Sequence, residues 1–382
     1  MRTILVRSYY NRITRKSNND YRSKGKMLKN LSGKTGRFCS TAVLAIGFGL
    51  VGCTSAPKPS NSTPQSPSAT QTQVSPVANL PKVVATTGVI CDITKEIAES
   101  SIDTTCLIKP GEDPHAYQTK PEDRKAIETA NLILYGGYNH EPSIIKLIKS
   151  SNNSAPKIAV HELAVPKPLM GEHEHGEEKA EDKPHAEGEK VPDPHVWHNA
   201  QNGIRMVETI RDELIKVAPT NAQLYTTNAT KLINDLAKID TWIKAQIATI
   251  PADKRKLVTT HDALSYYADA YGLQVAGALQ GVTTEEQPTA ARIAELSSEI
   301  KTAGVPTIFV ETTTNPKLME TVAREANIKI SDKELYSDEL GGPGTGADTY
   351  EGMLTTNTCA IASGLGGNCT PFAGEATPTP KP

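Results

Sequence analysis

The feature that most constrains the fold is one long amphipathic segment, residues 219–250, with alternating strand and helix patterns on either side of it. Its apolar residues recur every three or four positions, which places them on one stripe of a helix. Pro219 suits the first turn of that helix, and Pro251 ends it. We therefore expect a long helix that links two folded regions. The stripe consists of Leu224, Leu232, Leu236, Ile239, Ile243, Ile247 and Ile250.

Short apolar runs alternate with helical patterns on both sides of this segment. Strands that alternate with helices are typical of a parallel sheet. We predict an α/β fold with two Rossmann-like lobes, a first lobe over 82–218 and a second over 251–370, joined by the helix at 219–250. Paired lobes of this class usually bind ligands in the crevice between them. The predicted strands are 82–90, 132–137, 156–160, 256–260, 273–280, 305–312 and 328–331, and the first predicted helix covers 92–100.

A short apolar run near the N-terminus predicts export. Residues 41–52, "TAVLAIGFGLVG", follow a basic flank and are too few to span a bilayer, which needs about 20 residues. They are typical of a signal peptide over residues 1–52, and "LVGC" resembles a bacterial lipobox whose cysteine, Cys53, is lipidated. The alternative is an ordinary cut elsewhere with Cys53 discarded. The 26 residues before Met27 are polar, so a start at Met27 is a further hypothesis that N-terminal mapping would test.

The segments beside the predicted lobes have little to bury. Residues 53–81 are rich in Ser, Thr, Pro and Gln and predict a disordered tether, and residues 371–382 predict a disordered tail. A lipid with a flexible tether behind it places the folded part at the extracytoplasmic (periplasmic) face of a membrane. A net charge of −2 and an aromatic content of 5% give no indication of a nucleic-acid partner.

Four cysteines remain beyond Cys53. An even number of cysteines in an exported protein favours disulfides. Because each pair lies within one local unit, we favour Cys91 with Cys106 and Cys359 with Cys369 among the three possible pairings. Thiolate metal ligands are the competing interpretation, but no CxxC motif occurs.

The tripeptide Asp-Pro-His occurs twice, at residues 113–115 and 193–195, each time in a predicted loop. Proline fixes its own φ and restricts the residue before it, so His115 and His195 each leave a stiffened turn. Metal ligands need such stiff presentation. Two unrelated turns with exposed histidines would explain the repeat equally well.

Two further residues suit a ligand site. His261 directly follows a predicted strand, where α/β proteins place ligand groups, although it could instead cap the next helix, a role that Asp262 could also fill. Asp338 is a carboxylate in a polar turn after the last predicted strand. Taken alone, such an aspartate is more often a turn residue.

Together these motifs resemble a known family, the ZnuA-like cluster A-I substrate-binding lipoproteins of bacterial zinc and manganese ABC transporters. The resemblance covers residues 82 to about 368 and rests on "PGEDPHAYQTKPED", "DPHVWHN", "HDALSYYADAYGL" and "ELYSDEL", in family order. It implies two α/β lobes joined by one rigid backbone helix. It also implies that His115 and His195 are first-lobe metal ligands, while His261 and Asp338 come from the second lobe.

The implied donor set favours zinc. Family members that bind manganese usually show Glu where this chain has His261. Zinc accepts imidazole nitrogen and carboxylate oxygen in four-coordinate sites, whereas manganese, the harder ion, suits oxygen donors. We therefore expect Zn²⁺ as the transported ligand, with Mn²⁺ as the alternative. In some zinc-type members the aspartate binds weakly or through water, so direct ligation by Asp338 stays open.

Residues 170–192 form a charged, histidine-bearing stretch that is too polar to pack into a core. His173, His175 and His185 lie there among glutamates, and zinc-type family members carry a His- and acid-rich loop at this place. We interpret it as an auxiliary low-affinity metal loop. A solvated acidic loop with incidental histidines is the alternative. Three other histidines are interpreted as structural: His140, His161 and His198.

The resemblance implies a monomeric binding protein, not an enzyme, that delivers its metal to an ABC permease powered by a separate cytoplasmic ATPase. No Walker motif occurs in this chain. A zinc hydrolase is a different class of function, but no HExxH motif is present, and neither Asp262 nor Glu311 has an assignable catalytic role. A metal-storage or adhesion protein is a third class, which a neighbouring permease gene would exclude.

Overall fold

The computed structural model describes residues 80–173, 189–285 and 287–373. The predicted signal peptide, Cys53, nearly all of the predicted tether, His175, His185 and the end of the predicted tail lie outside these ranges. Within the described ranges, no helix has the length and apolar character that a membrane crossing requires.

The first lobe is built on a four-stranded parallel sheet in the order β2-β1-β3-β4. Alternate residues of its first strand face opposite sides: Val83 and Ala85 join a core with α1, α5 and α6, whereas Val84 joins a core with α2 and α3. The strands are β1 Lys82–Ala85, β2 Asp103–Cys106, β3 Leu132–Tyr135 and β4 Lys157–Ala159. The helices are α1 Gly88–Ala98, α2 Pro121–Thr129, α3 Pro142–Ser150, α4 Val160–Ala164 and α5 Ala200–Val217.

The first strand is shorter than its apolar pattern predicts. The prediction of a strand over 82–90 is wrong beyond Ala85, since α1 begins at Gly88. Val89, Ile90 and Ile93 are buried on the inner face of α1. A short apolar run satisfies a buried strand and a buried helix face equally, so periodicity could not locate this boundary.

The ends of the His- and acid-rich stretch form a hairpin. Strand β5 Met170–His173 pairs antiparallel with β6 Glu189–Pro192, so the prediction of a loop over 170–192 is wrong at both ends. The polar composition of these strands gave no alternating apolar pattern from which to predict them. His173 therefore lies in a strand.

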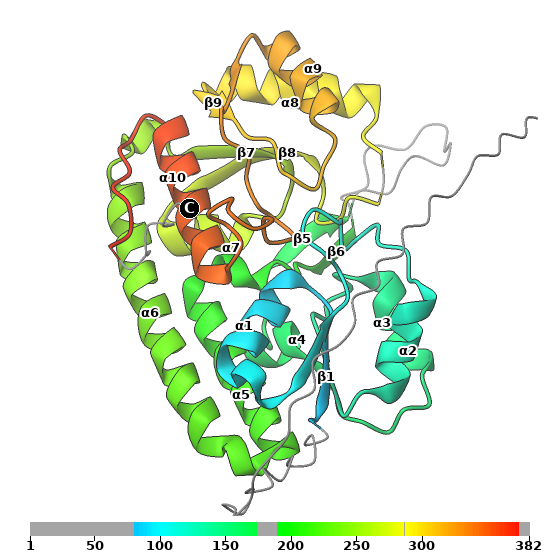
Figure 1. Cartoon of the computed structure of the whole chain (residues 1–382). Coiled ribbons are helices and arrows are strands. Elements are labelled where there is room, and N and C mark those ends of the chain that lie inside the picture. Colours follow the sequence, from blue (N-terminus) through cyan, green and yellow to red (C-terminus); the bar gives the residue numbers. More distant parts are fainter. Residues whose placement is uncertain (1–79, 174–188, 286, 374–382) are drawn as a thin grey trace, which may run out of the picture. The chain divides into compact units, whose positions relative to one another are not determined.

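The predicted linking helix is α6 Ala222–Ala248, and it packs against α1 and α5 of the first lobe and against α10 Tyr350–Gly364 (Figure 1). The residues of the predicted stripe from Leu232 onward are buried, and Leu224 is partly buried. Pro219 lies in a 3-10 turn before α6 rather than in its first turn.

The second lobe carries two short parallel strand pairs. Strand β7 Lys256–His261 pairs with β8 Gln274–Gln280, and β9 Thr307–Ile308 pairs with β10 Lys329–Ile330. The Phe309 N–H donates to the Val258 carbonyl at 3.0 Å, which places the two pairs side by side. The prediction of a strand over 305–312 exceeds the two residues of β9. The remaining helices are α7 Ser265–Tyr271, α8 Ala290–Ala303 and α9 Pro316–Ala326.

Two disulfides are present among the described residues. Cys91 in α1 is bonded to Cys106 at the end of β2, and Cys359 in α10 is bonded to Cys369. The first fastens a helix to the edge of the first-lobe sheet, and the second fastens the segment after α10 to that helix.

Candidate metal centre

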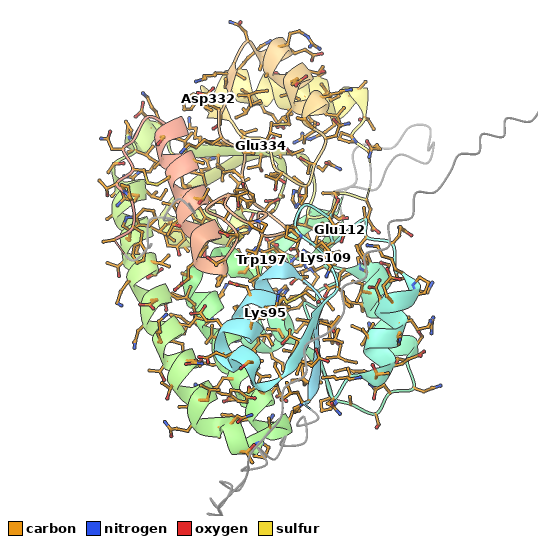
Figure 2. The ribbon with its side chains drawn as sticks, viewed as in Figure 1. Lys95, Lys109, Glu112, Trp197, Asp332 and Glu334 are labelled. Carbon is orange, nitrogen blue, oxygen red and sulfur yellow. A yellow bond between two sulfur atoms is a disulfide. The ribbon has the colours of Figure 1, made fainter. Side chains whose placement is uncertain are left out.

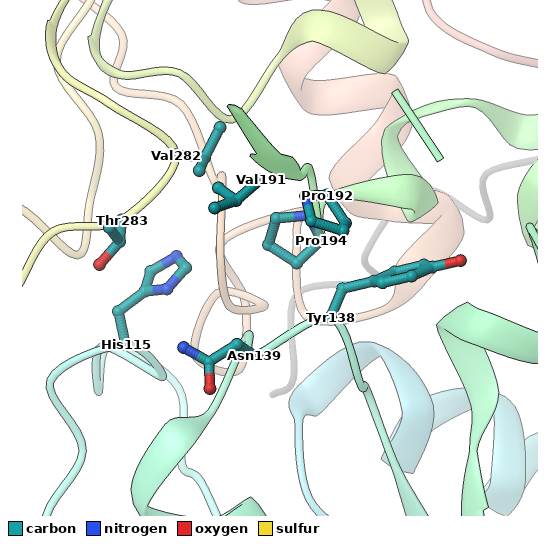
Figure 3. Close-up of a pocket in the computed structure, with 8 residues that line it drawn as sticks. All are labelled: His115, Tyr138, Asn139, Val191, Pro192, Pro194, Val282 and Thr283. Atoms are coloured by element: carbon teal, nitrogen blue, oxygen red, sulfur yellow. The ribbon is translucent and has the colours of Figure 1, made fainter. Parts of the chain in front are cut away.

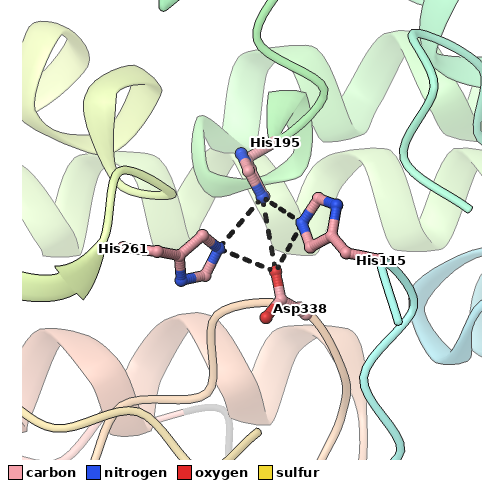
Figure 4. A group of neighbouring side chains, drawn as sticks. All are labelled: His115, His195, His261 and Asp338. Atoms are coloured by element: carbon pink, nitrogen blue, oxygen red, sulfur yellow. Dashed lines mark hydrogen bonds and ion pairs between the residues drawn. The ribbon is translucent and has the colours of Figure 1, made fainter. Parts of the chain in front are cut away.

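Four side chains from separate loops and strand ends converge at one place, as Figure 4 shows. His115 follows β2, His195 lies just before the 3-10 turn Val196–His198, His261 is the last residue of β7, and Asp338 follows β10. Successive members lie 80, 66 and 77 residues apart in the chain. One atom of each lies within 4.8 Å of one atom of every other, and all four residues are at most 3% exposed.

The donor atoms form a tight cluster. His195 Nε2 lies 3.3 Å from His115 Nε2, from His261 Nε2 and from Asp338 Oδ1. Asp338 Oδ1 lies 3.2 Å from His261 Nε2 and 3.6 Å from His115 Nε2. A proton on one Nε2 atom can form a hydrogen bond in only one direction, so protons alone do not account for all of these close contacts. A buried convergence of three imidazoles and one carboxylate is a His3Asp arrangement suited to a cation.

Asp193 orients the His195 ring. Its Oδ1 accepts from the His195 backbone N–H at 2.9 Å and lies 2.8 Å from His195 Nδ1. Because Nδ1 then donates its proton to the carboxylate, the Nε2 lone pair faces the cluster. The first Asp-Pro-His turn repeats the backbone part of this arrangement, with the His115 N–H donating to Asp113 Oδ1 at 2.9 Å.

Glu311 orients the His261 ring in the same way as Asp193 orients that of His195. One oxygen accepts from the backbone N–H groups of Thr260 and His261 at 2.9 and 3.0 Å, and the other hydrogen-bonds His261 Nδ1. The carboxylate is only 1% exposed. The Asp-Pro-His repeat was a signal that could have identified Asp193 as an orienting residue, whereas only the fold brings Glu311 to His261.

The two oxygens of the Asp338 carboxylate have different partners. Oδ1 faces the histidines, while Oδ2 accepts from Thr313 Oγ1 at 2.7 Å and from Ser337 Oγ at 3.2 Å. The carbonyl of Ser337 in turn accepts from Trp197 Nε1 at 3.2 Å and lies 2.9 Å from His198 Nε2. The loop that carries Asp338 is thus held by first-lobe side chains, including Trp197, which is buried inside the molecule (Figure 2).

Charge and burial compete strongly in this cluster. Burial on its own would lower the pKa of His261, but Asp338 and Glu311 outweigh it and hold that pKa well above its usual range. Burial would likewise raise the pKa of Asp338, but the charge of His261 and hydrogen bonds from the histidines hold it well below its usual range. Protons and a metal cation therefore compete for the same lone pairs.

A pocket of about 350 Å³ opens beside His115 (Figure 3). Val282 and Thr283 of the second lobe form one wall of this pocket. Val282 also packs against Gly171 of β5, where an added Cβ would lie 2.1 Å from its Cγ1. The remaining lining residues are Tyr138, Asn139, Val191, Pro192 and Pro194. Of the four clustered residues, His115 is the one that lines this pocket, together with Val191 and Pro192 of β6.

Two further buried histidines, His140 and His161, lie on the first-lobe side of the cluster. His140 is 5.0 Å from His115 between ring centroids, and His161 is 5.8 Å from His140. Burial, followed by the neighbouring His115, holds the pKa of His140 well below its usual range, and burial lowers the pKa of His161 to about 3. Both lowered pKa values favour the neutral form of the imidazole ring.

Comparison with known proteins places this arrangement in a family. The family model for the zinc-uptake complex component A, periplasmic (ZnuA), matches residues 83–364. The chain belongs to this family. The ZnuA family comprises metal-binding substrate-binding proteins of ABC transporters and not enzymes, so the expected absence of catalysis is confirmed. The solved structures that this chain resembles confirm the predicted α/β fold class.

Individual relatives span most of the chain. The manganese ABC transporter substrate-binding lipoprotein PsaA of Streptococcus anginosus is 33% identical over 290 residues, covering 74% of this chain and 89% of its own length. The manganese-binding lipoprotein MntA of Halalkalibacterium halodurans is 29% identical, with 74% and 88% covered. The periplasmic zinc-binding protein TroA of Treponema pallidum is 32% identical in a solved structure, with a TM-score of 0.67 over 75% of this chain and 99% of TroA.

Proposed function

We propose that this protein captures Zn²⁺ outside the cytoplasm through His115, His195, His261 and Asp338 and delivers it to an ABC importer. The observation that carries the proposal is the convergence of three buried imidazoles and one carboxylate from both lobes. The metal is the cargo, so the two lobes form a carrier site for a single ion.

The spacing of the donor atoms suits zinc. Four donors at about 2.0–2.2 Å from a tetrahedral zinc ion lie about 3.3–3.6 Å apart. The five separations among donor atoms given above range from 3.2 to 3.6 Å. Asp338 Oδ1 takes part in three of these five, which supports its direct ligation rather than ligation through water.

The donor types also favour zinc over manganese. Three of four donors are imidazole nitrogens, which suit Zn²⁺ better than the harder Mn²⁺. Manganese is the second candidate, because PsaA and MntA are named for manganese. TroA, with a similar degree of identity, is named for zinc.

Delivery requires partners that are separate chains. We infer that the partners are a permease and a cytoplasmic ATPase. We also infer that a lipid on Cys53 anchors this protein to the membrane and that the carrier is a monomer. The PsaA and MntA relatives are named lipoproteins, which supports the anchor. His173, His175 and His185 would form a low-affinity collecting loop, whose base forms part of the wall of the pocket beside His115.

Competition titration tests the proposal. Purified protein is titrated with Zn²⁺ and Mn²⁺ against a chelator of known affinity, beside the single variants His115→Ala, His195→Ala, His261→Ala and Asp338→Ala. We expect one tight zinc ion per chain, weaker manganese, and loss of tight binding in each variant. Tight zinc binding that survives all four substitutions would refute the assigned site, and a manganese preference would overturn the choice of metal.

A further inference from the structure

Beyond the four donors, His140 is a buried imidazole on the first-lobe side of the centre. Its ring centroid lies 5.0 Å from that of His115 and 5.7 Å from that of His195. His115 and His195 are themselves 5.4 Å apart. These three rings form a triangle of nearly equal edges, and all three residues belong to the first lobe.

The triangle matches the one that the proposed ligands make. His261 lies 5.1 Å from His195 and 5.7 Å from His115, measured between the same centroids. Both triangles share the edge between His115 and His195, and their remaining edges differ by no more than 0.7 Å. The ring of His140 in the first lobe is thus about as far from His115 and His195 as the ring of His261 in the second lobe is.

The ring nitrogens of His140 are buried and lack hydrogen bonds to the described residues. His140 is 0% exposed, and neither Nδ1 nor Nε2 has a hydrogen-bond partner among the described residues. Leaving a buried polar atom without a partner is energetically costly, so this arrangement needs a reason. Glu141 Oε2 lies 3.7 Å from Nδ1, and the opposite oxygen of that carboxyl group accepts hydrogen bonds from Thr86 Oγ1 and the Gly136 N–H.

The backbone before His140 is strained in a way that positions it. Gly137, Tyr138 and Asn139 have φ values of 93°, 50° and 59°, so three consecutive residues occupy left-handed conformations. Non-glycine residues adopt this region at a cost, and such strain gathers where a side chain must be presented in one direction. The turn is closed by the His140 N–H, which donates to the Gly137 carbonyl at 3.0 Å.

We propose that His140, with His115 and His195, forms a retention site within the first lobe that holds the metal ion after the second-lobe donors withdraw. This inference rests on the proposed function and deepens it. His140 lies outside the group of donors within 4.8 Å of one another, so the ion must shift toward it or its ring must turn. Withdrawal of His261 and Asp338 removes the donors that hold the ion on the opposite side of the shared edge. A first-lobe imidazole then keeps three nitrogen donors on an ion that would otherwise keep two.

The test isolates the first lobe's donors. The background variant carries His261→Ala and Asp338→Ala, together with alanine at His173, His175 and His185 to remove loop binding. Zn²⁺ affinity of the purified protein is measured with and without His140→Leu added to this background. The matched control adds His161→Leu instead, a buried histidine that also packs on Trp197, at 5.1 Å between centroids.

We expect the background to retain measurable zinc binding, His140→Leu to weaken it by about 10-fold or more, or about 1.4 kcal/mol, and His161→Leu to change it by less than about 3-fold. Co²⁺ absorption should show the d–d bands of the background losing intensity only with His140→Leu. No zinc binding by the background, or equal effects of the two leucine variants, would overturn the retention site. Circular dichroism verifies that each variant is folded.

Failure of this inference can be told apart from failure of the proposed function. The chain with all four proposed ligands intact is titrated in parallel. If that chain binds zinc tightly and the leucine variants do not differ, only the retention site is wrong. If the intact chain binds no divalent metal tightly, the proposed function itself is wrong.

Discussion

The backbone N–H of Gly88, the first residue of α1, donates a 2.6 Å hydrogen bond to Oε1 of Glu339, which lies 251 residues later in the chain. Glu339 is 0% exposed and directly follows Asp338. The N-terminus of a first-lobe helix thereby holds the loop that brings Asp338 to the metal centre. Helix N-termini favour such oxygen acceptors, since their backbone N–H groups lack partners within the helix.

Substituting Gly88 should therefore weaken metal binding from a distance. A Cβ at this position would lie 2.2 Å from Glu339 Oε2 and 3.2 Å from Leu340 Cγ. We expect Gly88→Ala to lower zinc affinity by about 10-fold, because the displaced loop carries Asp338 with it. Gly342→Ala, whose Cβ would meet nothing within 4 Å, is the control, and competition titration measures both. Equal affinities in the two variants would contradict this coupling.

Exchanging one ligand should change the choice of metal. In His261→Glu an oxygen donor replaces one of three imidazoles, which suits the harder manganese ion. We expect the ratio of zinc to manganese affinity to fall by about 10-fold or more, or about 1.4 kcal/mol in relative binding free energy. Parallel titrations of both ions on wild type and variant measure the ratio. An unchanged ratio would show that the ligand type at residue 261 does not set the preference.

Removing the carboxylates that orient the histidines should weaken binding without removing a ligand. Asp193→Asn and Glu311→Gln retain size but lose the charge that fixes the rings of His195 and His261. Loss of such a partner typically costs about 10–100-fold in metal affinity. The control is Asp332→Asn, an exposed second-lobe carboxylate paired with Lys329 (Figure 2). An orienting role is refuted if all three variants bind like wild type.

The stability of the metal-free protein should depend on Asp92. Burial raises the pKa of this α1 carboxyl to about 6, while the hydrogen bond from the Tyr350 N–H lowers it and Glu96 raises it. Because the pKa in the folded protein exceeds the ordinary value of 3.8, the folded state binds the proton more tightly. Its stabilising contribution is present below that ordinary value and is lost as pH rises through about 6.

Asp92→Asn removes this dependence. We expect the variant to exceed wild type in free energy of unfolding by about 2–3 kcal/mol at pH 8, with the gain shrinking toward zero near pH 4. Urea unfolding of both proteins at the two pH values measures it. Asp103→Asn, an exposed carboxyl at the start of β2, controls for general charge effects. A gain of the same size at both pH values would mean that titration of Asp92 is not its cause.

The disulfides should stabilise the fold without affecting metal binding. Cys91 and Cys106 lie 15 positions apart in the sequence, and Cys359 and Cys369 lie 10 apart. Loops of these lengths correspond to about 3 kcal/mol each if the bond acts by restricting the unfolded chain. The paired serine variants should lose about that much in urea unfolding, with zinc affinity unchanged. Loss of zinc binding in either would place that disulfide in the support of the site.

Much of the fold and of the site could be predicted from local patterns. The stripe from Leu232 to Ile250 predicts the helix that packs on both lobes, since a 3.6-residue period is a property of the sequence itself. The Asp-Pro-His turns predict His115 and His195 as presented side chains because proline restricts the backbone locally. The boundary between β1 and α1 could not be found in this way, because Val89 and Ile90 suit either element.

By itself the sequence determined which residues can donate to a metal and which segments become helices, because donor chemistry and periodicity belong to the residues and their near neighbours. Only the tertiary structure decided that Glu311 orients His261, that Glu339 ties the Asp338 loop to Gly88, and that His140 lies beside His115. Each of these relationships joins residues between 25 and 251 positions apart. Such contacts arise from how the lobes pack, and packing depends on the whole buried core rather than on any short stretch of the chain.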